Sequence, residues 1–197
     1  MHTSVYRKMP RQYTQTKRAE QQAETRQRIV EAAVELHGEV GPANTTVSMI
    51  AARAGVQRHT FYAHFPDERA MLMACSGHTV EHDPLPDAAQ WAELPKGEAR
   101  LKAGLAELYA WYERNEGVVG CSLRDAEVHE LTREIVELRF GPPMAGYQDA
   151  LGAGLKAGQR AMLGLALSFF TWRTLVREAG LDARKAAAAM AQAVMGA

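Results

Sequence analysis

Residues 45–65 read TTVSMIAARAGVQRHTFYAHF and describe two short helices joined by a tight turn. Thr46 can cap a first helix over residues 47–54, because its hydroxyl can accept a hydrogen bond from an N–H group in the first turn. Gly55 can adopt the left-handed conformation that commonly ends a helix. A second helix follows over residues 57–64. The stretch therefore predicts a helix-turn-helix motif.

The second of these helices has one apolar and one polar side. At about 100° per residue, Phe61 and Phe65 face the core together. His59 and Ala63 then point outward, with Arg58 and Tyr62 on one flank and Thr60 on the other. Such a face can donate hydrogen bonds to phosphates and base edges, and a helix this short fits a major groove about 12 Å wide. We therefore expect this helix to contact duplex DNA.

The composition is that of an ordinary globular chain. The 197 residues are 47% hydrophobic and 23% charged, and 23 basic side chains balance 23 acidic ones. Only two cysteines, Cys75 and Cys121, are present, which excludes a disulfide framework and fits a reducing compartment. No apolar run reaches the ~18 residues of a membrane span, and no apolar leader begins the chain. We expect a cytoplasmic protein with no membrane partner.

The charge is unevenly distributed along the chain. Residues 1–65 hold nine basic and five acidic side chains. Five of the basic residues precede Glu20, and no acidic residue precedes it. Residues 1–18 are therefore expected to form a flexible basic arm. Two interpretations remain open, a solvated tail or a cationic arm beside a polyanion-binding surface.

The rest of the chain shows helical rather than strand periodicity. A helix is expected over residues 19–37, and Asp67 and Asp182 are expected to cap two later helices. The glycine and prolines at 141–143 are expected to break the pattern. Residues 159–179 are apolar on nearly every face, which predicts a helix covered by its own core and by a second subunit. Two apolar stripes lie between, one at Leu101, Leu105, Leu108 and Tyr112 and the other at Val128, Leu131, Ile135 and Leu138.

Residues 45–65 resemble the DNA-binding signature of the TetR family of bacterial transcriptional regulators, T-T-V-x-x-I-A-x-x-A-G-V-S-x-[GA]-[TS]-[LF]-Y-x-[HY]-F. The similarity covers about residues 24–72, and the remainder agrees only in helical layout. The resemblance implies an all-α fold, with an N-terminal three-helix helix-turn-helix DNA-binding domain over 19–66. It implies a larger helical ligand-binding and dimerisation domain over 67–197, and a homodimer through the last two helices.

The function implied by the resemblance is that of a ligand-responsive transcriptional regulator. A repressor of this kind is released from palindromic double-stranded operator DNA by a small-molecule inducer. The resemblance assigns phosphate contacts to Thr46, Ser48, Thr60, Tyr62 and His64, and places Gln57, Arg58 and His59 nearest the base edges. Arg58 can pair with guanine and Gln57 with adenine.

Four positions depart from the family pattern. Gln57 stands where a capping serine is common, and His59 replaces a small residue. Glu68 occupies a position that is often lysine, with Arg69 next to it, which puts one phosphate contact in doubt. His37 stands in place of a core aromatic residue, and we interpret it as a partly buried, hydrogen-bonded histidine rather than a ligand.

Aromatic residues of the C-terminal region can form a core or line a small-molecule pocket together with a few polar groups. Arg124 is a further candidate for orienting a ligand there. The candidate ligand-binding residues are Tyr109, Tyr112, Cys121, His129, Phe140, Phe169, Trp172 and Arg173.

The sequence gives no sign of an enzyme. None of the seven histidines follows an Asp or Glu by three residues, as a helical di-iron site requires, and no phosphate loop or nucleophile elbow is present. We expect no catalytic residue, cofactor or metal. Cys75, His78 and His82 share a helix face, but they span about 10 Å, which is too far for all three to bind one ion without other groups. Whether they have a metal or redox role stays open. The alternative function is a helical small-molecule binding protein without DNA function.

Overall fold

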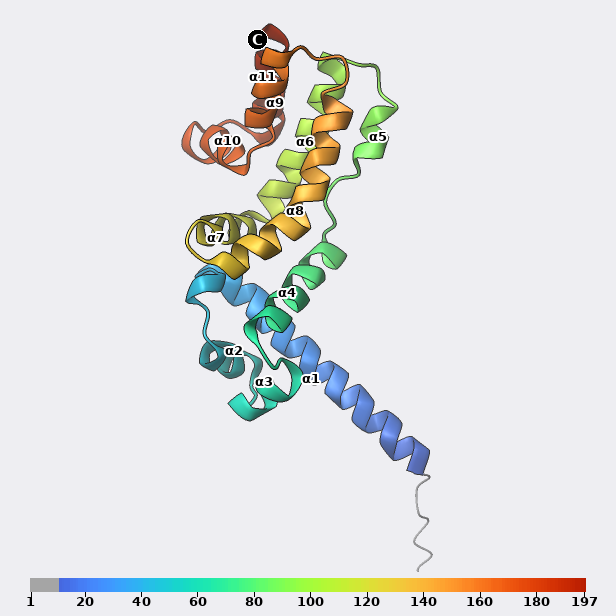
Figure 1. Ribbon diagram of the computed structural model, residues 1–197, viewed down its shortest axis with the longest axis vertical. Helices are drawn as coiled ribbons and strands as arrows, with labels where there is room; N and C mark the ends of the chain where they lie inside the picture. Colours follow the sequence, from blue (N-terminus) through green and yellow to red (C-terminus); the bar gives the residue numbers. More distant parts are fainter. Residues whose placement is uncertain (1–10) are drawn as a thin grey trace, which may run out of the picture.

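The computed structural model describes residues 11–197, with side chains from residue 15 onward, and this part of the chain is helical with no strand (Figure 1). The predicted all-α fold class is confirmed. None of the described helices is long and apolar enough to cross a membrane. The helices are α1 (Arg11–Glu39), α2 (Val47–Ala54), α3 (Arg58–His64), α4 (Glu68–His82), α5 (Ala88–Ala92), α6 (Glu98–Arg114), α7 (Glu116–Ala126), α8 (Glu130–Leu151), α9 (Ala157–Ala166), α10 (Phe169–Arg173) and α11 (Ala183–Gly196). A 3-10 turn, η1 (Pro42–Asn44), precedes α2, and a π-helical turn, η2 (Thr174–Glu178), follows α10.

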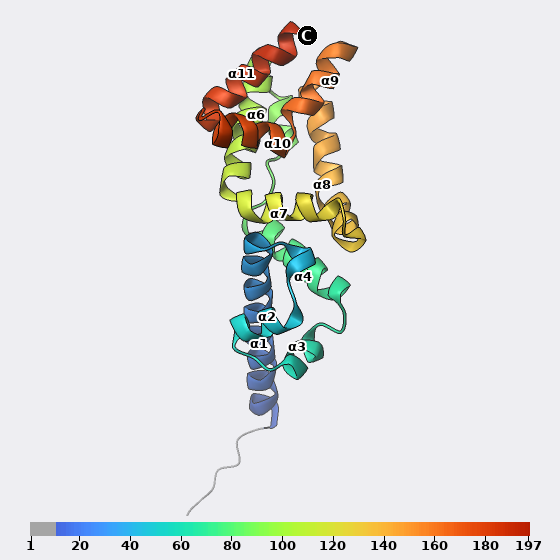
Figure 2. The ribbon, with the colours of Figure 1, turned by 90° about the vertical axis from the view of Figure 1, so that its left-hand side faces the viewer.

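The molecule is elongated, with α1–α3 at one end and α5, α6 and α8–α11 at the other (Figures 1 and 2). The core of the first end contains Ile29 and Ala33 of α1 with Phe61 and Phe65 of the α3 region. It also includes Cys75, so α4 belongs to this core and links it to the rest of the chain. The second core surrounds α6, and its largest members are Trp91, Tyr109, Trp111, Tyr147 and Trp172.

Helix α1 begins earlier than the sequence predicts. A start near residue 19 and a flexible arm over 1–18 were expected, but residues 11–18 are helical. Residues 15–24 are all exposed. This half of α1 therefore extends beyond the core, in which Ile29 is the first buried residue of the helix. The arm prediction is therefore wrong for 11–18, and residues 1–10 lie outside the described part.

Helix α8 does not end at its two prolines. Pro142 and Pro143 lie inside the helix, so the break expected at 141–143 is wrong. The carbonyl of Leu138 loses its helical donor at Pro142, and Leu138 is 49% exposed, so water can satisfy that carbonyl. The helix beyond is held by buried Tyr147, whose hydroxyl donates to the Pro86 carbonyl at 2.7 Å.

The apolar segment 159–179 is not one helix. α9 ends at Ala166, and Ser168 caps α10 by accepting a hydrogen bond from the Phe170 N–H at 3.2 Å. The hydroxyls of Tyr109 and Tyr112 on α6 donate to the Ala166 and Leu167 carbonyls at 2.8 and 2.7 Å. Because these tyrosines satisfy the carbonyls at the end of α9, the chain can turn there without leaving buried acceptors unpaired.

One of the two predicted apolar stripes is confirmed, and the other is wrong in part. Leu101, Leu105, Leu108 and Tyr112 are all buried on α6, as expected. The second stripe is wrong in part, because Val128 lies outside α8 and is 83% exposed, and Leu138 is exposed as well. Only Ile135 of that set is fully buried.

Candidate nucleic-acid interface and ligand cavity

The α2–turn–α3 segment has the local geometry that the sequence predicts. The Thr46 side chain accepts a hydrogen bond from the Met49 N–H at 3.3 Å, so the predicted cap is confirmed. Gly55 ends α2 with φ 66° and ψ 38°, a left-handed conformation that costs glycine little. Phe65 ends α3, and Asp67 caps α4 through the Ala70 N–H at 2.7 Å.

Helices α2 and α3 are held against α1 by apolar and charged contacts. Ile50 and Phe61 are buried in the shared core. Arg53 on α2 donates to both carboxylate oxygens of Glu39 at 2.9 Å and to Glu35 at 3.1 Å. Since these ion pairs are exposed, they contribute little free energy. Their effect is to fix the orientation of α2 on α1.

The residues predicted to contact DNA are all exposed or partly exposed on α2, α3 and the residues that precede them, and we call this set the α3 face. Arg58 at the start of α3 forms no ion pair or hydrogen bond with any residue of 11–197, so its guanidinium is available. Gln57 precedes α3 without a side-chain cap, as its departure from the family pattern predicts. The exposed members are Thr46, Ser48, Gln57, Arg58, His59 and Tyr62, and the partly exposed ones are Thr60 and His64.

Glu68 and Arg69 point toward the second end of the molecule rather than to the α3 face. Arg69 donates to Glu134 on α8 at 2.6 Å, and Glu68 lies 3.5 Å from the ring of His129. The phosphate contact that the sequence left in doubt is therefore replaced by contacts between α4 and the α8 region.

Helix α7 crosses the end of α1 at a junction of two glycines (Figure 2). A β-carbon on Gly117 would lie 3.1 Å from the carbonyl oxygen of Gly38. The two backbones can approach this closely only because neither residue has a side chain. The thiol of Cys121, one turn further along α7, points to the same carbonyl at 3.5 Å.

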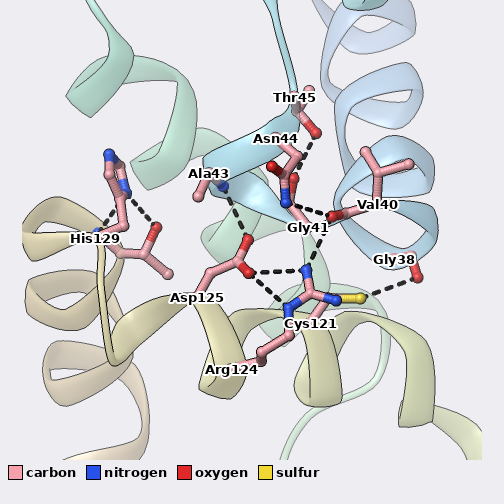
Figure 3. Close-up of polar contacts among 11 residues, drawn as sticks. Gly38, Val40, Gly41, Ala43, Asn44, Thr45, Cys121, Arg124, Asp125 and His129 are labelled. Carbon is pink, nitrogen blue, oxygen red and sulfur yellow. Dashed lines mark hydrogen bonds and ion pairs between the residues drawn. The ribbon is translucent and has the colours of Figure 1, made fainter.

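The end of α7 holds the link between α1 and α2, as Figure 3 shows. Asp125 is 3% exposed, and its carboxylate accepts from the Ala43 N–H at 2.9 Å and from Arg124 at 2.8 Å. Arg124 also donates to the Val40 carbonyl at 2.9 Å. We call this set of contacts the Asp125 junction. It connects α7 to the segment that leads into α2.

His37 is buried beside this junction. Removal from water disfavours the charged ring and lowers the pKa of His37 to about 4, although nearby Asp125 opposes the shift. His37 is therefore a neutral core residue at pH 7. It is more deeply buried than expected from the sequence, and the expected hydrogen bond is wrong, because its ring forms none with the described residues 11–197.

The buried histidine makes stability depend on pH. The unfolded chain takes up a proton at His37 below about pH 6.5, whereas the folded chain does so only near pH 4. Stability from this group is complete above pH 6.5 and falls as the pH drops toward 4, by roughly 2 kcal/mol at pH 5. Urea unfolding at pH 8 and pH 5 should show this loss in wild type and a smaller one in His37→Phe. An equal reduction of the loss in the exposed-site control His59→Gln would contradict the assignment.

A cavity lies between α4, α7 and α8 and has two lobes. The outer lobe contains about 490 Å³ of space free of protein atoms, part of it open to solvent, and reaches Trp111, Arg139 and Phe140. The inner lobe, of about 370 Å³, reaches His37 on α1 and Pro42 in η1. The lobes share six lining residues, so they adjoin. The shared residues are Ser76, Thr79, Val118, Ser122, Ile135 and Val136.

The N-terminal helices are the part of the chain with the strongest similarity to known proteins. The family model for bacterial regulatory proteins of the tetR family matches residues 29–75, which include α2 and α3. The HTH-type transcriptional regulator SrpR of Pseudomonas putida is 39% identical over 74 residues, or 36% of this chain. Residues 29–75 are thus similar to the tetR family of bacterial regulatory proteins.

The match to SrpR spans only about a third (35%) of that relative. Similarity to the class C tetracycline repressor protein of Escherichia coli extends further, at 26% identity over 164 residues, 80% of this chain and 68% of the repressor. The solved structure of AibR in complex with isovaleryl coenzyme A and operator DNA shares the fold. Its TM-score is 0.63 at 17% identity, over 87% of this chain and 98% of AibR.

The structure does not bring the predicted ligand-binding residues into one site. Phe140 lines the outer lobe, whereas Cys121, Phe169 and Arg173 line a separate surface recess with Arg124. Tyr109, Tyr112 and Trp172 are buried in the second core. His129 caps α8 through Thr132.

Several cavity residues were not predicted from the sequence. Ser76 and Thr79 lie one turn apart on α4, and Ile135 and Arg139 lie one turn apart on α8. The available signal was two polar residues one turn apart on α4 and an arginine one turn from an apolar residue on α8. It could not be used because the pairing of α4 with α8 is not evident from sequence.

Within residues 11–197, no three His, Cys, Asp or Glu side chains are placed to hold a metal ion. The Cys75 thiol points to the Val30 carbonyl at 3.9 Å, and burial raises its pKa to about 12. The rings of His78 and His82 lie against each other, with centroids 3.8 Å apart.

Proposed function

We propose that this chain is a ligand-responsive DNA-binding transcriptional regulator, a repressor that a small-molecule inducer releases from a palindromic operator. The observation that carries the proposal is the α3 face, where an unpaired arginine and several hydrogen-bonding side chains are exposed on a short helix. AibR, which shares the fold, was solved with both operator DNA and isovaleryl coenzyme A.

The roles proposed for the α3 face differ between residues. Gln57, Arg58 and His59 would read base edges in the major groove, since the N-terminal residues of a recognition helix lie deepest there. Thr46, Ser48, Thr60, Tyr62 and His64 would bind phosphates and set the position of the helix. We place the DNA-binding domain at 19–66 and the ligand-binding and dimerisation domain at 67–197, with α4 contributing to both.

The cavity is the proposed inducer site, because its inner lobe contacts the DNA-binding end directly. A ligand there would touch Val34 and His37 of α1 and Pro42 of η1. Release from DNA requires that the ligand bind the released state more tightly than the DNA-bound state. Expansion of the inner lobe would move α1 and η1, and thereby shift α2 and α3 relative to the partner protomer.

The proposed functional unit is a homodimer formed through the last two helices expected from the sequence, 159–179 and 186–194, which the structure forms as α9, α10 and α11. Leu165 at the end of α9 and Phe170 on α10 are 54% and 45% exposed, which is unusual for side chains of this size. Two protomers would present their α3 helices about 34–36 Å apart, the spacing of successive major grooves.

Disruption of this interface should give monomers. The double variant Leu165→Glu, Phe170→Glu is expected to be monomeric, because burying two carboxylates against the partner is costly. Light scattering after size-exclusion chromatography measures the mass directly. Val128→Glu, also an exposed apolar position but outside α9–α11, is the control and should stay dimeric. A dimeric double variant would place the interface elsewhere.

DNA binding is tested by fluorescence anisotropy with the DNA upstream of the chain's own gene. The logarithm of the affinity should fall linearly with the logarithm of the salt concentration, because phosphate contacts release counterions. If no DNA bound even at low salt, the alternative of a helical small-molecule binding protein without DNA function would be favoured, since the cavity does not depend on DNA.

A further inference from the structure

Arg139 on α8 is held at the edge of the outer lobe by two neutral groups. Its Nε donates to the Ser76 hydroxyl at 3.1 Å, and a terminal nitrogen donates to the Met73 carbonyl at 3.3 Å. A guanidinium has five N–H groups, so three remain for another acceptor. Arg139 forms no ion pair with any residue of the described range 11–197.

Among the described residues that line the cavity, one is a cation and none is a carboxylate. Neither lobe is lined by Asp or Glu. His37 in the inner lobe is neutral at pH 7, which leaves Arg139 as the charged group of the lining. The rest of the outer lobe is mostly apolar and includes Trp111, Ile135 and Phe140.

Arg139 also lines a surface recess outside the cavity, with Arg26, His78 and Glu81. Glu81 is the one carboxylate of that recess and lies beyond ion-pair distance of Arg139. The guanidinium therefore lies between solvent and the apolar lobe. An anion could reach it from outside while an attached apolar group entered the cavity.

We propose that the ligand of this cavity is a monocarboxylic acid with an apolar body. Its carboxylate would pair with the free N–H groups of Arg139, in the two-point geometry that guanidinium and carboxylate favour. Its body would lie against Trp111, Ile135 and Phe140. This proposal rests on the proposed function only in taking the cavity as the inducer site.

The test compares octanoate with octanamide, which has the same shape but no charge, by isothermal titration calorimetry on the full chain without DNA. Wild type should bind octanoate at least about tenfold more tightly. Arg139→Gln should lose this preference and bind the two ligands equally. Arg184→Gln removes the same charge from an exposed position on α11 and should keep the preference. Arg139→Lys retains a cation and should also prefer the acid. This variant keeps the test decisive if Arg139→Gln does not fold.

Equal affinities of wild type for acid and amide would overturn the proposal, and so would absence of binding up to about 1 mM. An unchanged preference in Arg139→Gln would equally overturn it. Octanoate binding that depends on Arg139 but does not release operator DNA would support the ligand class and contradict the inducer role, so the two proposals can fail separately.

Discussion

Replacing Gly41 by alanine is expected to lower the free energy of unfolding by at least about 3 kcal/mol. Gly41 has φ 96° and ψ 155°, a region of backbone space that is essentially restricted to glycine and costs other residues about 1–3 kcal/mol. A β-carbon there would also collide with the Asp125 carboxylate and the Arg124 guanidinium. The collision adds to the backbone cost, because Asp125 is buried and cannot move into solvent. Urea unfolding at pH 7 measures the loss.

Gly55→Ala is the matched control for this experiment. Gly55 also has a positive φ, 66°, but a β-carbon there meets nothing within 4 Å. The expected loss is only the left-handed backbone cost of about 1–2 kcal/mol. If both variants lost the same stability, the Asp125 junction would not constrain the link between α1 and α2.

Replacing Arg58 by alanine is expected to reduce the preference for the operator over unrelated DNA by about 30-fold or more. One bidentate arginine–guanine contact contributes about 1–3 kcal/mol of discrimination, and a dimer on a palindrome makes it twice. The reduction follows from loss of base contacts, since Arg58 forms no contact that holds the fold within the described residues 11–197. Competition anisotropy with operator and scrambled duplexes gives the ratio of affinities.

Tyr62→Phe should behave differently from Arg58→Ala. Tyr62 is 48% exposed and its ring packs edge-on against Phe61, so the hydroxyl can be removed without disturbing the core. Loss of a phosphate contact should weaken binding to both duplexes alike and leave their ratio unchanged. Wild-type selectivity in Arg58→Ala would exclude Arg58 from base readout, whichever way Tyr62→Phe behaves.

The local signals of residues 45–67 predicted structure well. Thr46, Gly55 and Asp67 act through groups within three or four residues of themselves, so the periodicity and caps that define α2 and α3 can be read from sequence. The exposed position of His59 followed from the inward direction of Phe61 and Phe65. The same reasoning failed at Pro142, where contacts of Tyr147 with a distant segment preserve the helix.

The ligand site could be predicted only in part. Phe140 was a candidate and does line the cavity, but Arg139 beside it was not. Tyr109 and Tyr112 were candidates because aromatic residues suit pockets, yet their hydroxyls satisfy backbone carbonyls of the C-terminal helices. Sequence spacing shows which residues share a helix face but not which helix covers that face.

The amino-acid sequence by itself determined the all-α class, the helix-turn-helix motif and the polar face of α3, because each depends on interactions between residues close in the chain. The tertiary structure alone decided that Gly38 and Gly117 bring α1 and α7 together, that Asp125 holds η1, and that Arg139 borders an apolar cavity. These features join residues about 60 to 80 positions apart. Such contacts form only when helix packing brings the residues together, and no local pattern encodes that pairing.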